Sequence, residues 1–313
     1  MNLKELATID AGLAPGHRLC PGCGAAIIAN IVQRVARAKG YELVVANATG
    51  CLEVATTIYP YTSWRIPWIH NAFENAAATI SGVESAYKVL KKKGRVKKDN
   101  IRFVVFGGDG GSYDIGLQSM SGAFERRHKF LYIVYDNEAY MNTGIQRSSA
   151  TPLGAWTTTT PIGSTHRGKE VERKDLTMIA VAHRLPYVAQ ASIAFLPDLV
   201  RKIEKALDVD GPSFINILST CPRGWYFDPA DTLKVARMAV ETNFWPLFEV
   251  VNGRFILNYE PKERKPITEW IKLQGRYKHL WEDTPQNREI IARIQRDIDE
   301  RFNYIKRLAS LHE

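Results

Sequence analysis

Short apolar segments alternate with helical segments along most of this 313-residue chain, and this alternation restricts the possible folds more than any other feature. The apolar segments are rich in β-branched and aromatic side chains, which is typical of buried strands. The expected strands span residues 42–47, 102–108, 130–136, 186–190 and 213–218. The expected helices span residues 25–38, 71–93, 115–127, 176–183 and 196–209. This order predicts an α/β fold of three layers, with a mainly parallel sheet covered by helices on both faces.

The alternation fades after about residue 228, where aromatic and charged segments lead into a helical tail over residues 287–311. We therefore expect a cofactor-binding domain of residues 1–226. Residues 227–313 form a C-terminal helical appendage in this prediction, packed on that domain or on a partner. Hydrophobic residues make up 45% of the chain and charged residues 24%, a balance that excludes collagen-like and disordered chains.

Neither a membrane span nor a secretion signal is apparent in the sequence. No stretch approaches the roughly 20 apolar residues that cross a bilayer, and residues 1–12 lack the layout of a signal peptide. We therefore expect a cytoplasmic protein. The formal net charge of +9 suits an acidic partner or a polyanionic ligand. Residues 88–98 hold seven Lys and Arg without interleaved aromatic side chains, which favours a solvated loop over a nucleic-acid surface.

Reactive side chains follow four of the expected strands. They are Cys51 after the first strand, Asp109 after the second, Asn137 and Asn142 after the third, and Cys221 after the last. Parallel strands end at the same edge of a sheet, and ligands of such folds bind there. Turns also favour Gly, Asn and Asp, but turn chemistry does not explain the cysteines. We expect a ligand site at this edge.

A Gly-Asp-Gly sequence at residues 108–110 is followed by 26 residues and then by Asn137. If the two strands are neighbours, the Asp109 carboxylate and the Asn137 amide lie about 5 Å apart. Their oxygens suit Mg²⁺, which takes one or two side chains together with phosphate oxygens and water. Glycines around Asp109 let backbone amides approach a diphosphate. The sequence does not match two other phosphate-binding motifs. Tyr113 stands where a dinucleotide-binding fingerprint has its third glycine, and Glu170 stands where a P-loop has Ser or Thr.

Four cysteines are present in the chain, at positions 20, 23, 51 and 221. In a reducing compartment such a set binds a metal or does redox chemistry more often than it forms disulfides. Their spacing alone permits either a zinc ion or an iron–sulfur cluster.

Four motifs occur in order along the chain: CPGCG (20–24), NATGC (47–51), GDGGSYDIG (108–116) and YDNEAYMNTGIQRS (135–148). The Gly-Asp-Gly sequence, followed by 26 residues and Asn137, is similar to the thiamine diphosphate fingerprint. Together the four motifs resemble the β subunits of 2-oxoacid:ferredoxin oxidoreductases. The resemblance extends over most of residues 17–226, and it is greatest to the pyruvate synthase type, with the oxalate and 2-oxoisovalerate enzymes related.

The resemblance implies specific roles for these residues. Asp109, Asn137 and the carbonyl of Ala139 would bind Mg²⁺, and Asn142 would lie beside the reactive part of the cofactor. The residues implied to contact thiamine diphosphate are Thr49, Gly50, Gly108, Asp109, Gly110, Gly111, Asn137, Ala139 and Asn142. The residues implied to hold one [4Fe-4S] cluster are Cys20, Cys23, Cys51 and Cys221.

The implied function is oxidative decarboxylation of a small 2-oxoacid. Pyruvate is the expected substrate, coenzyme A the acyl acceptor and ferredoxin the electron acceptor. Oxalate, oxidised to CO₂ without coenzyme A, is the alternative. α, γ and δ-type subunits are the expected partners, and the glutamate that activates thiamine would come from the α subunit rather than from Glu53 or Glu74 of this chain. A rival hypothesis is a non-catalytic, zinc-stabilised binding module, and neither nucleic acid nor membrane is expected as a partner of the enzyme.

Overall fold

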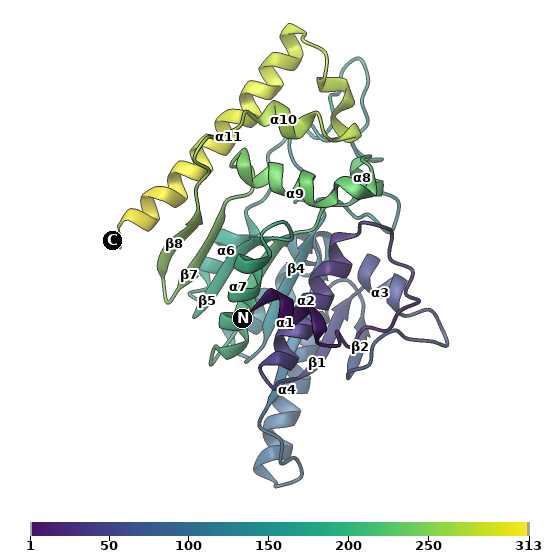
Figure 1. The fold of residues 1–313 in the computed structure, drawn as a ribbon, viewed down its shortest axis with the longest axis vertical. Coiled ribbons are helices and arrows are strands. Elements are labelled where there is room, and N and C mark those ends of the chain that lie inside the picture. The colour runs from purple at the N-terminus through teal and green to yellow at the C-terminus, as the bar shows by residue number, and fades with distance from the viewer. Residues whose placement is uncertain (1, 312–313) are drawn as a thin grey trace.

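The structure is a computed structural model and describes residues 2–311. One eight-stranded sheet crosses the molecule, in the order β2-β1-β3-β4-β6-β5-β7-β8 (Figure 1). Its strands are β1 (Glu42–Ala48), β2 (Trp68–Asn71), β3 (Ile101–Gly108), β4 (Leu131–Asp136), β5 (Tyr187–Ser192), β6 (Ser213–Leu218), β7 (Leu247–Val251) and β8 (Arg254–Tyr259). The first six strands are mutually parallel, whereas β7 runs antiparallel to β5 and to β8. The predicted α/β fold with a mainly parallel sheet is confirmed.

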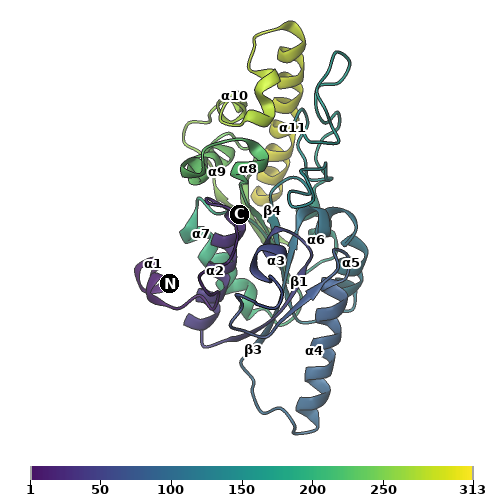
Figure 2. The same ribbon diagram turned by 90° about the vertical axis from the view of Figure 1, so that its right-hand side faces the viewer.

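Helices cover both faces of the sheet, which makes three layers (Figure 2). The helices are α1 (Leu3–Thr8), α2 (Gly24–Ala38), α3 (Cys51–Thr56), α4 (Ala76–Lys92), α5 (Leu117–Glu125), α6 (Leu176–Ala182), α7 (Leu196–Asp208), α8 (Pro222–Trp225), α9 (Thr232–Glu241), α10 (Ile267–Ile271) and α11 (Pro285–Ser310). Short turns of other helical types are η1 (Gly110–Asp114), η2 (Pro229–Asp231) and η3 (Gly275–Leu280).

The core divides into two clusters, one on each face of the sheet. On one face α2 and α7 bury apolar side chains such as Ile28 and Ile203 against the strands. On the other face α4, α5, α6 and α11 bury side chains such as Ile80, Phe124 and Ile305. Successive strand residues point to opposite faces, so every central strand contributes to both clusters. No helix in the described part of the chain is long and apolar enough to cross a lipid bilayer.

The segment around residue 71 differs from its prediction. The expected helix over residues 71–93 begins only at Ala76, because residues 68–71 instead form the parallel edge strand β2. This strand pairs with β1 in the register Val45 to Trp68, and the Asn71 carbonyl accepts a hydrogen bond from the Thr49 N–H at 2.8 Å.

The chain beyond residue 226 adds strands as well as helices. β7 and β8 form a hairpin that extends the sheet, outside the predicted alternation. A sequence signal for it was available, because Asn252-Gly253 lies between two apolar segments and both residues have positive φ, as a tight hairpin turn requires. A third apolar cluster joins α9, α10 and α11 above the end of β6, around Trp225, Trp245 and Trp270.

Candidate functional site

A pocket opens at the edge of the sheet where the parallel strands end. Its walls come mainly from the ends of β1, β3 and β4 and the segments that follow them, with Phe73 from the segment after β2, and these four strands are neighbours in the sheet. All nine residues predicted to contact the cofactor line this cavity, together with Cys51 and with Phe73, Tyr135, Tyr140, Met141 and Thr143. Three parallel neighbouring strands thus bring the predicted residues to one place.

Three oxygen atoms from Asp109, Asn137 and Ala139 converge at the base of the cavity. The Asn137 amide atom that faces the other two residues lies 2.9 Å from Asp109 Oδ1 and 2.9 Å from the Ala139 carbonyl oxygen. Oriented as oxygen, this atom completes a set of three acceptors with no proton between them. Oriented as nitrogen, it donates to both neighbours. A cation is the partner that suits the first orientation.

The other carboxylate oxygen of Asp109 is held from the opposite side. Ser148 Oγ donates to Asp109 Oδ2 at 2.5 Å, which leaves Oδ1 directed toward Asn137. Asp109 is fully buried, and this burial raises the pKa of its carboxyl group well above the usual value. The nearby Asp136 carboxylate raises it further. A bound cation would reverse both effects, because it favours the charged carboxylate.

Two buried arginines neutralise the acidic residues on either side of Asn137. Arg173 donates to Asp136 Oδ2 at 2.5 Å and to Glu138 Oε1 at 2.7 Å. Arg276 donates to Glu138 Oε2 at 2.6 Å, and its guanidinium lies 3.9 Å from the Trp225 ring centroid. All four charged side chains are at most 4% exposed. Buried charges of this kind persist only when they are paired and hydrogen-bonded.

The same network sets the backbone between the candidate metal ligands. Glu138 has φ of 68°, which is unusual for a residue with a side chain. Its N–H donates to Asp136 Oδ1 at 3.1 Å, its carbonyl accepts from Thr151 Oγ1 at 2.6 Å, and its carboxylate is fixed by the arginines. This left-handed residue turns the chain so that Asn137 and the Ala139 carbonyl face the same point as Asp109.

The four cysteines are near one another beside this cavity. Cys23 and Cys221 are the N-caps of α2 and α8, and Cys51 is the first residue of α3. Gly24, at the start of α2, packs closely on Ser219. A Cβ atom added to Gly24 would lie 2.9 Å from the Cα atom of Ser219. This contact brings the Cys20–Cys23 loop to the segment that ends in Cys221.

Electrostatic coupling among the thiols follows from this arrangement. Burial raises the pKa of the Cys51 thiol, and negative charge on the other three cysteines raises it further. Burial also raises the pKa of Cys221 to about 12, whereas the backbone N–H of Gly224 lowers it. Such coupling falls off with distance, so the four thiols lie within reach of one another. All four are free of disulfides. Within residues 2–311, no three His, Cys, Asp or Glu side chains converge closely enough to hold a single metal ion.

Other residues considered from the sequence lie outside the cavity wall. Glu53 is buried beside it and sits 3.6 Å from His70 Nδ1, while His70 Nε2 is 2.9 Å from Thr49 Oγ1. Glu74 is exposed, and His166 pairs with Glu170 at the surface. His70 therefore contacts a cavity residue, Thr49, without lining the cavity itself.

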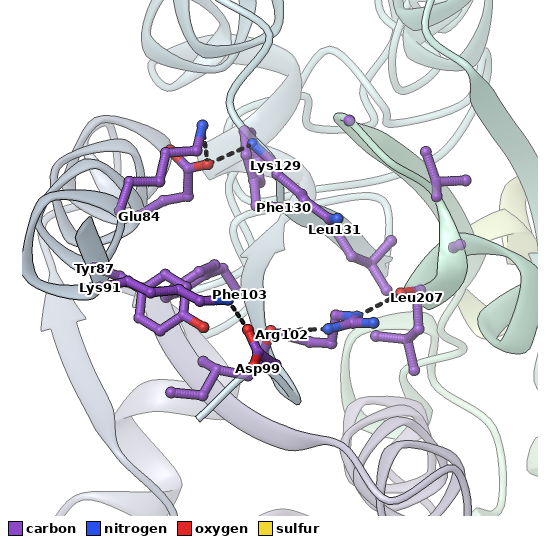
Figure 3. A pocket seen from close by; sticks show the side chains of 15 residues that line it. Glu84, Tyr87, Lys91, Asp99, Arg102, Phe103, Lys129, Phe130, Leu131 and Leu207 are labelled. Atoms are coloured by element: carbon purple, nitrogen blue, oxygen red, sulfur yellow. Dashed lines mark hydrogen bonds and ion pairs between the residues drawn. The ribbon is translucent and has the colours of Figure 1, made fainter. Parts of the chain in front are cut away.

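A second cavity, of about 630 Å³, lies at the opposite edge of the sheet, where β3 and β4 begin (Figure 3). Its charged side chains are paired within the chain: Lys91 with Asp99, and Arg102 with the Leu207 carbonyl oxygen at 2.9 Å. Although this cavity is the larger one, none of the predicted site residues lines it. The basic run 88–98 ends α4 and projects from the same side of the molecule, away from the candidate site (Figure 1).

Several residues of the site had no assigned role in the sequence. Tyr135 begins the fourth motif and Ser148 ends it, so both could have been noticed there. Arg173 and Arg276 carry no comparable signal, because their contacts join segments far apart in the chain.

Comparison with known proteins gives a consistent result. The family described as "Thiamine pyrophosphate enzyme, C-terminal TPP binding domain" matches residues 48–217, which contain the whole cavity wall. Pyruvate synthase subunit PorB of Methanocaldococcus jannaschii is 55% identical, over 92% of this chain and 94% of the relative. Pyruvate synthase subunit PorB of Thermotoga maritima is 50% identical, over 100% of this chain and 97% of the relative.

Two further comparisons extend the range of similar proteins. Ketoisovalerate oxidoreductase subunit VorB of Pyrococcus furiosus is 42% identical over 99% of this chain and 98% of the relative. The solved structure of 2-oxoglutarate:ferredoxin oxidoreductase from Magnetococcus marinus, with 2-oxoglutarate, coenzyme A and succinyl-CoA bound, aligns with a TM-score of 0.55. It is 21% identical and covers 74% of this chain and 81% of that chain, so it shares the fold.

Proposed function

This chain belongs to the β subunits of the 2-oxoacid:ferredoxin oxidoreductases, and from that premise we propose that it supplies the magnesium, thiamine diphosphate and iron–sulfur sites for the oxidative decarboxylation of pyruvate. The membership makes the chain part of a thiamine diphosphate-dependent oxidoreductase and excludes the non-catalytic binding module. The observation that carries the proposal is the single cavity that gathers all nine predicted cofactor residues.

The three converging oxygens fit a magnesium ion. Mg²⁺ binds oxygen at about 2.05 Å in octahedral geometry, which separates adjacent ligand atoms by about 2.9 Å. The two contacts of the Asn137 amide atom, with Asp109 and with the Ala139 carbonyl, have this length. In the proposal these three residues bind the ion, which leaves the remaining positions for diphosphate oxygens and water. Arg173 and Arg276 then hold the protein side of the site in this arrangement.

The four thiols fit an iron–sulfur cluster better than a structural zinc site in this context. Three of them stand at helix N-termini, whose partial positive charge favours thiolates and an anionic cluster. Cys51 also lines the thiamine cavity, so a redox centre on these thiols would be next to the decarboxylation site. An electron carrier has to lie close to the site of decarboxylation, whereas a structural zinc ion can stabilise the fold from any position.

Thiamine diphosphate would supply the electron sink for loss of CO₂ from the 2-oxoacid. The chain itself binds the diphosphate end, excludes water from its buried carboxylates and positions Asn142 and Thr49 on the cavity wall. The four cysteines would hold a cluster that supplies a one-electron acceptor, and ferredoxin would be the final acceptor through other subunits.

Pyruvate is the proposed substrate because the pyruvate synthase relatives match at up to 55% identity, above the 42% of the ketoisovalerate relative. Coenzyme A is the proposed acyl acceptor. Oxalate, which has no acyl group to transfer, remains the alternative. We propose residues 1–226 as the cofactor-binding domain and residues 227–313 as an appendage that supports it through Arg276.

Partner subunits complete the site in this proposal. Large apolar side chains are exposed on the segments that follow the cavity residues Cys51 and Gly111, including Tyr59 at 94%, Tyr61 at 78% and Ile115 at 55% exposure. An α-type subunit that covers them would bring the glutamate that activates thiamine. The isolated chain is therefore expected to be inactive.

The test is to purify the whole complex without oxygen and to assay a panel of 2-oxoacids with and without coenzyme A. The expected complex is brown, contains iron and labile sulfide, and reduces ferredoxin with pyruvate only when coenzyme A is present. Turnover of oxalate without coenzyme A would favour the alternative substrate. Stoichiometric zinc without iron, or full activity of the isolated chain, would overturn the proposal.

A further inference from the structure

The hydroxyl of Tyr135 is buried at the site, with its oxygen close to the Leu52 N–H and its own proton unpaired. Tyr135 lies on β4, is 1% exposed and lines the cavity beside Cys51. Among the described residues no acceptor takes its proton. A buried polar group left unpaired costs about 1–3 kcal/mol, so such groups are rare unless a ligand satisfies them.

Two glycines make room for this side chain. A Cβ at Gly50 would lie 2.4 Å from the Tyr135 hydroxyl oxygen, and a Cβ at Gly108 would lie 3.2 Å from its ring. The backbone of Gly50 is extended, with φ of 162°, a conformation that other residues also adopt. A side chain is therefore excluded at this position by the close approach of the Tyr135 hydroxyl, not by the backbone conformation. Gly50 precedes Cys51 and Gly108 precedes Asp109. The hydroxyl is therefore placed between the thiol cluster and the candidate metal ligands.

The hydroxyl faces the side of the sheet on which the cysteines gather. Tyr135 belongs to the apolar cluster shared with α2, the helix capped by Cys23, whereas Tyr132 on the same strand belongs to the cluster on the other face. The buried phenol therefore offers its unpaired proton on the face of the sheet that carries the thiols.

We propose that Tyr135 donates a hydrogen bond to a sulfur atom of the iron–sulfur cluster held by the four cysteines, and that this bond raises the reduction potential of the cluster. The inference rests on the proposed function. Hydrogen bonds to cluster sulfurs are a principal means by which proteins set such potentials, because they stabilise the more negative, reduced state. Tyr135 would thus ease the transfer of the first electron from the decarboxylation site.

The experiment compares the complex carrying Tyr135→Phe with the complex carrying Tyr132→Phe. Tyr132 is the matched control, because it is an equally buried tyrosine on β4 whose hydroxyl is satisfied by Ser112 Oγ at 3.0 Å. Iron and labile sulfide are measured first. The midpoint potential of the cluster is then followed by electron paramagnetic resonance in a redox titration, with its signal assigned by its loss in Cys51→Ser.

The expected result is a lower midpoint potential in Tyr135→Phe and an unchanged one in Tyr132→Phe. Ferredoxin reduction should slow in Tyr135→Phe while KM for the 2-oxoacid is unchanged. Loss of iron from Tyr135→Phe alone, with the complex still assembled, would also support the contact. An unchanged potential, weaker binding of thiamine diphosphate instead, or equal iron loss from both variants would overturn the inference. A wild-type chain without iron would overturn the proposed function as well, so the two failures can be told apart.

A second pair of variants tests the position of the hydroxyl. Gly50→Ala places a methyl group against the Tyr135 oxygen and should lower the iron content. Combined with Tyr135→Phe, which removes that oxygen, the same substitution should recover iron to the level of Tyr135→Phe alone. A double variant with less iron than Tyr135→Phe would contradict the proposed placement.

Discussion

Arg276 donates to Glu138 at 2.6 Å, an ion pair between two fully buried residues that lie 138 positions apart in the chain. Glu138 is flanked by Asn137 and Ala139, which carry two of the three converging oxygens. Arg276 therefore links the C-terminal part of the chain to the segment that carries two of the candidate metal ligands. Four predictions follow from this and the related contacts.

Replacing Arg276 with Gln should both destabilise the chain and weaken its binding of Mg²⁺ and thiamine diphosphate. Removing one partner of a buried ion pair costs about 3–5 kcal/mol, because the other charge is left unpaired. Thermal unfolding and titration of bound thiamine diphosphate against Mg²⁺ measure the two effects. Arg288→Gln is the control, since its pair with Asp283 is exposed and should contribute little.

A loss of stability in Arg276→Gln without a change in Mg²⁺ affinity would mean that the arginine is structural only. A core substitution in the same C-terminal cluster, Ile298→Val, distinguishes a loss of stability alone from a loss of Mg²⁺ affinity. It should lower the melting temperature and leave the Mg²⁺ requirement unchanged.

Ser148→Ala should raise the Mg²⁺ concentration needed to bind thiamine diphosphate by roughly tenfold. Its hydroxyl donates to Asp109 Oδ2, and a hydrogen bond to a charged group contributes about 1.5–3 kcal/mol. Without it Asp109 is free to turn away from Asn137. Isothermal titration at several Mg²⁺ concentrations checks this, with Ser119→Ala on the surface of α5 as the control. Identical Mg²⁺ dependence in the two variants would contradict the role of Ser148.

Chelation with EDTA should release thiamine diphosphate while the iron content stays the same. The oxygen ligands of the proposed magnesium site hold a hard cation, whereas thiolates hold iron. Bound thiamine and iron are measured after gel filtration, and added Mg²⁺ should restore thiamine binding. Retention of thiamine after complete removal of Mg²⁺ would argue against a metal-bridged diphosphate.

The stability of the chain should rise with pH between about 7 and 10 because of Lys169. This ammonium group is 2% exposed and donates to the carbonyl oxygens of Ser149, Thr151 and Glu172, with no carboxylate partner among its hydrogen bonds. Burial lowers the pKa of Lys169 to about 7. The unfolded lysine, whose pKa is near 10.4, therefore binds more protons in this window.

The sign of the effect follows from proton linkage. Stability rises wherever the unfolded chain binds more protons, here by up to about 1.4 kcal/mol per pH unit. Melting temperatures across this pH window should show a smaller slope for Lys169→Met than for the wild type. Lys272→Met, which changes an exposed lysine, should keep the wild-type slope. Parallel slopes for all three proteins would refute the prediction.

The sequence was sufficient to predict the elements that depend on local patterns. Apolar runs identified β1, β3, β4, β5 and β6, and their parallel order put Asp109 and Asn137 on neighbouring strands. The meeting of parallel strand ends at one edge predicted Asp109, Asn137 and Asn142 there, whereas the full set of nine cofactor residues came from the family resemblance.

Features that depend on distant contacts could not be predicted in this way. The edge strand β2 has a short and half-exposed pattern, so only its pairing with β1 defines it. The ion pairs of Arg173 and Arg276 join segments more than thirty residues apart, and nothing in the local sequence of either arginine indicates its partner. The hairpin of β7 and β8 is different, because its Asn-Gly turn was visible in the sequence.

The strand order also bears on how the protein is made. β6, which precedes Cys221, lies between β4 and β5 in the sheet although β5 comes earlier in the chain. A nascent chain on the ribosome therefore presents Cys20, Cys23 and Cys51 long before the fourth cysteine is synthesised and β6 has entered the middle of the sheet. In the proposed function the cluster needs all four thiols, so its insertion is expected to follow the synthesis of Cys221 and the entry of β6 into the sheet.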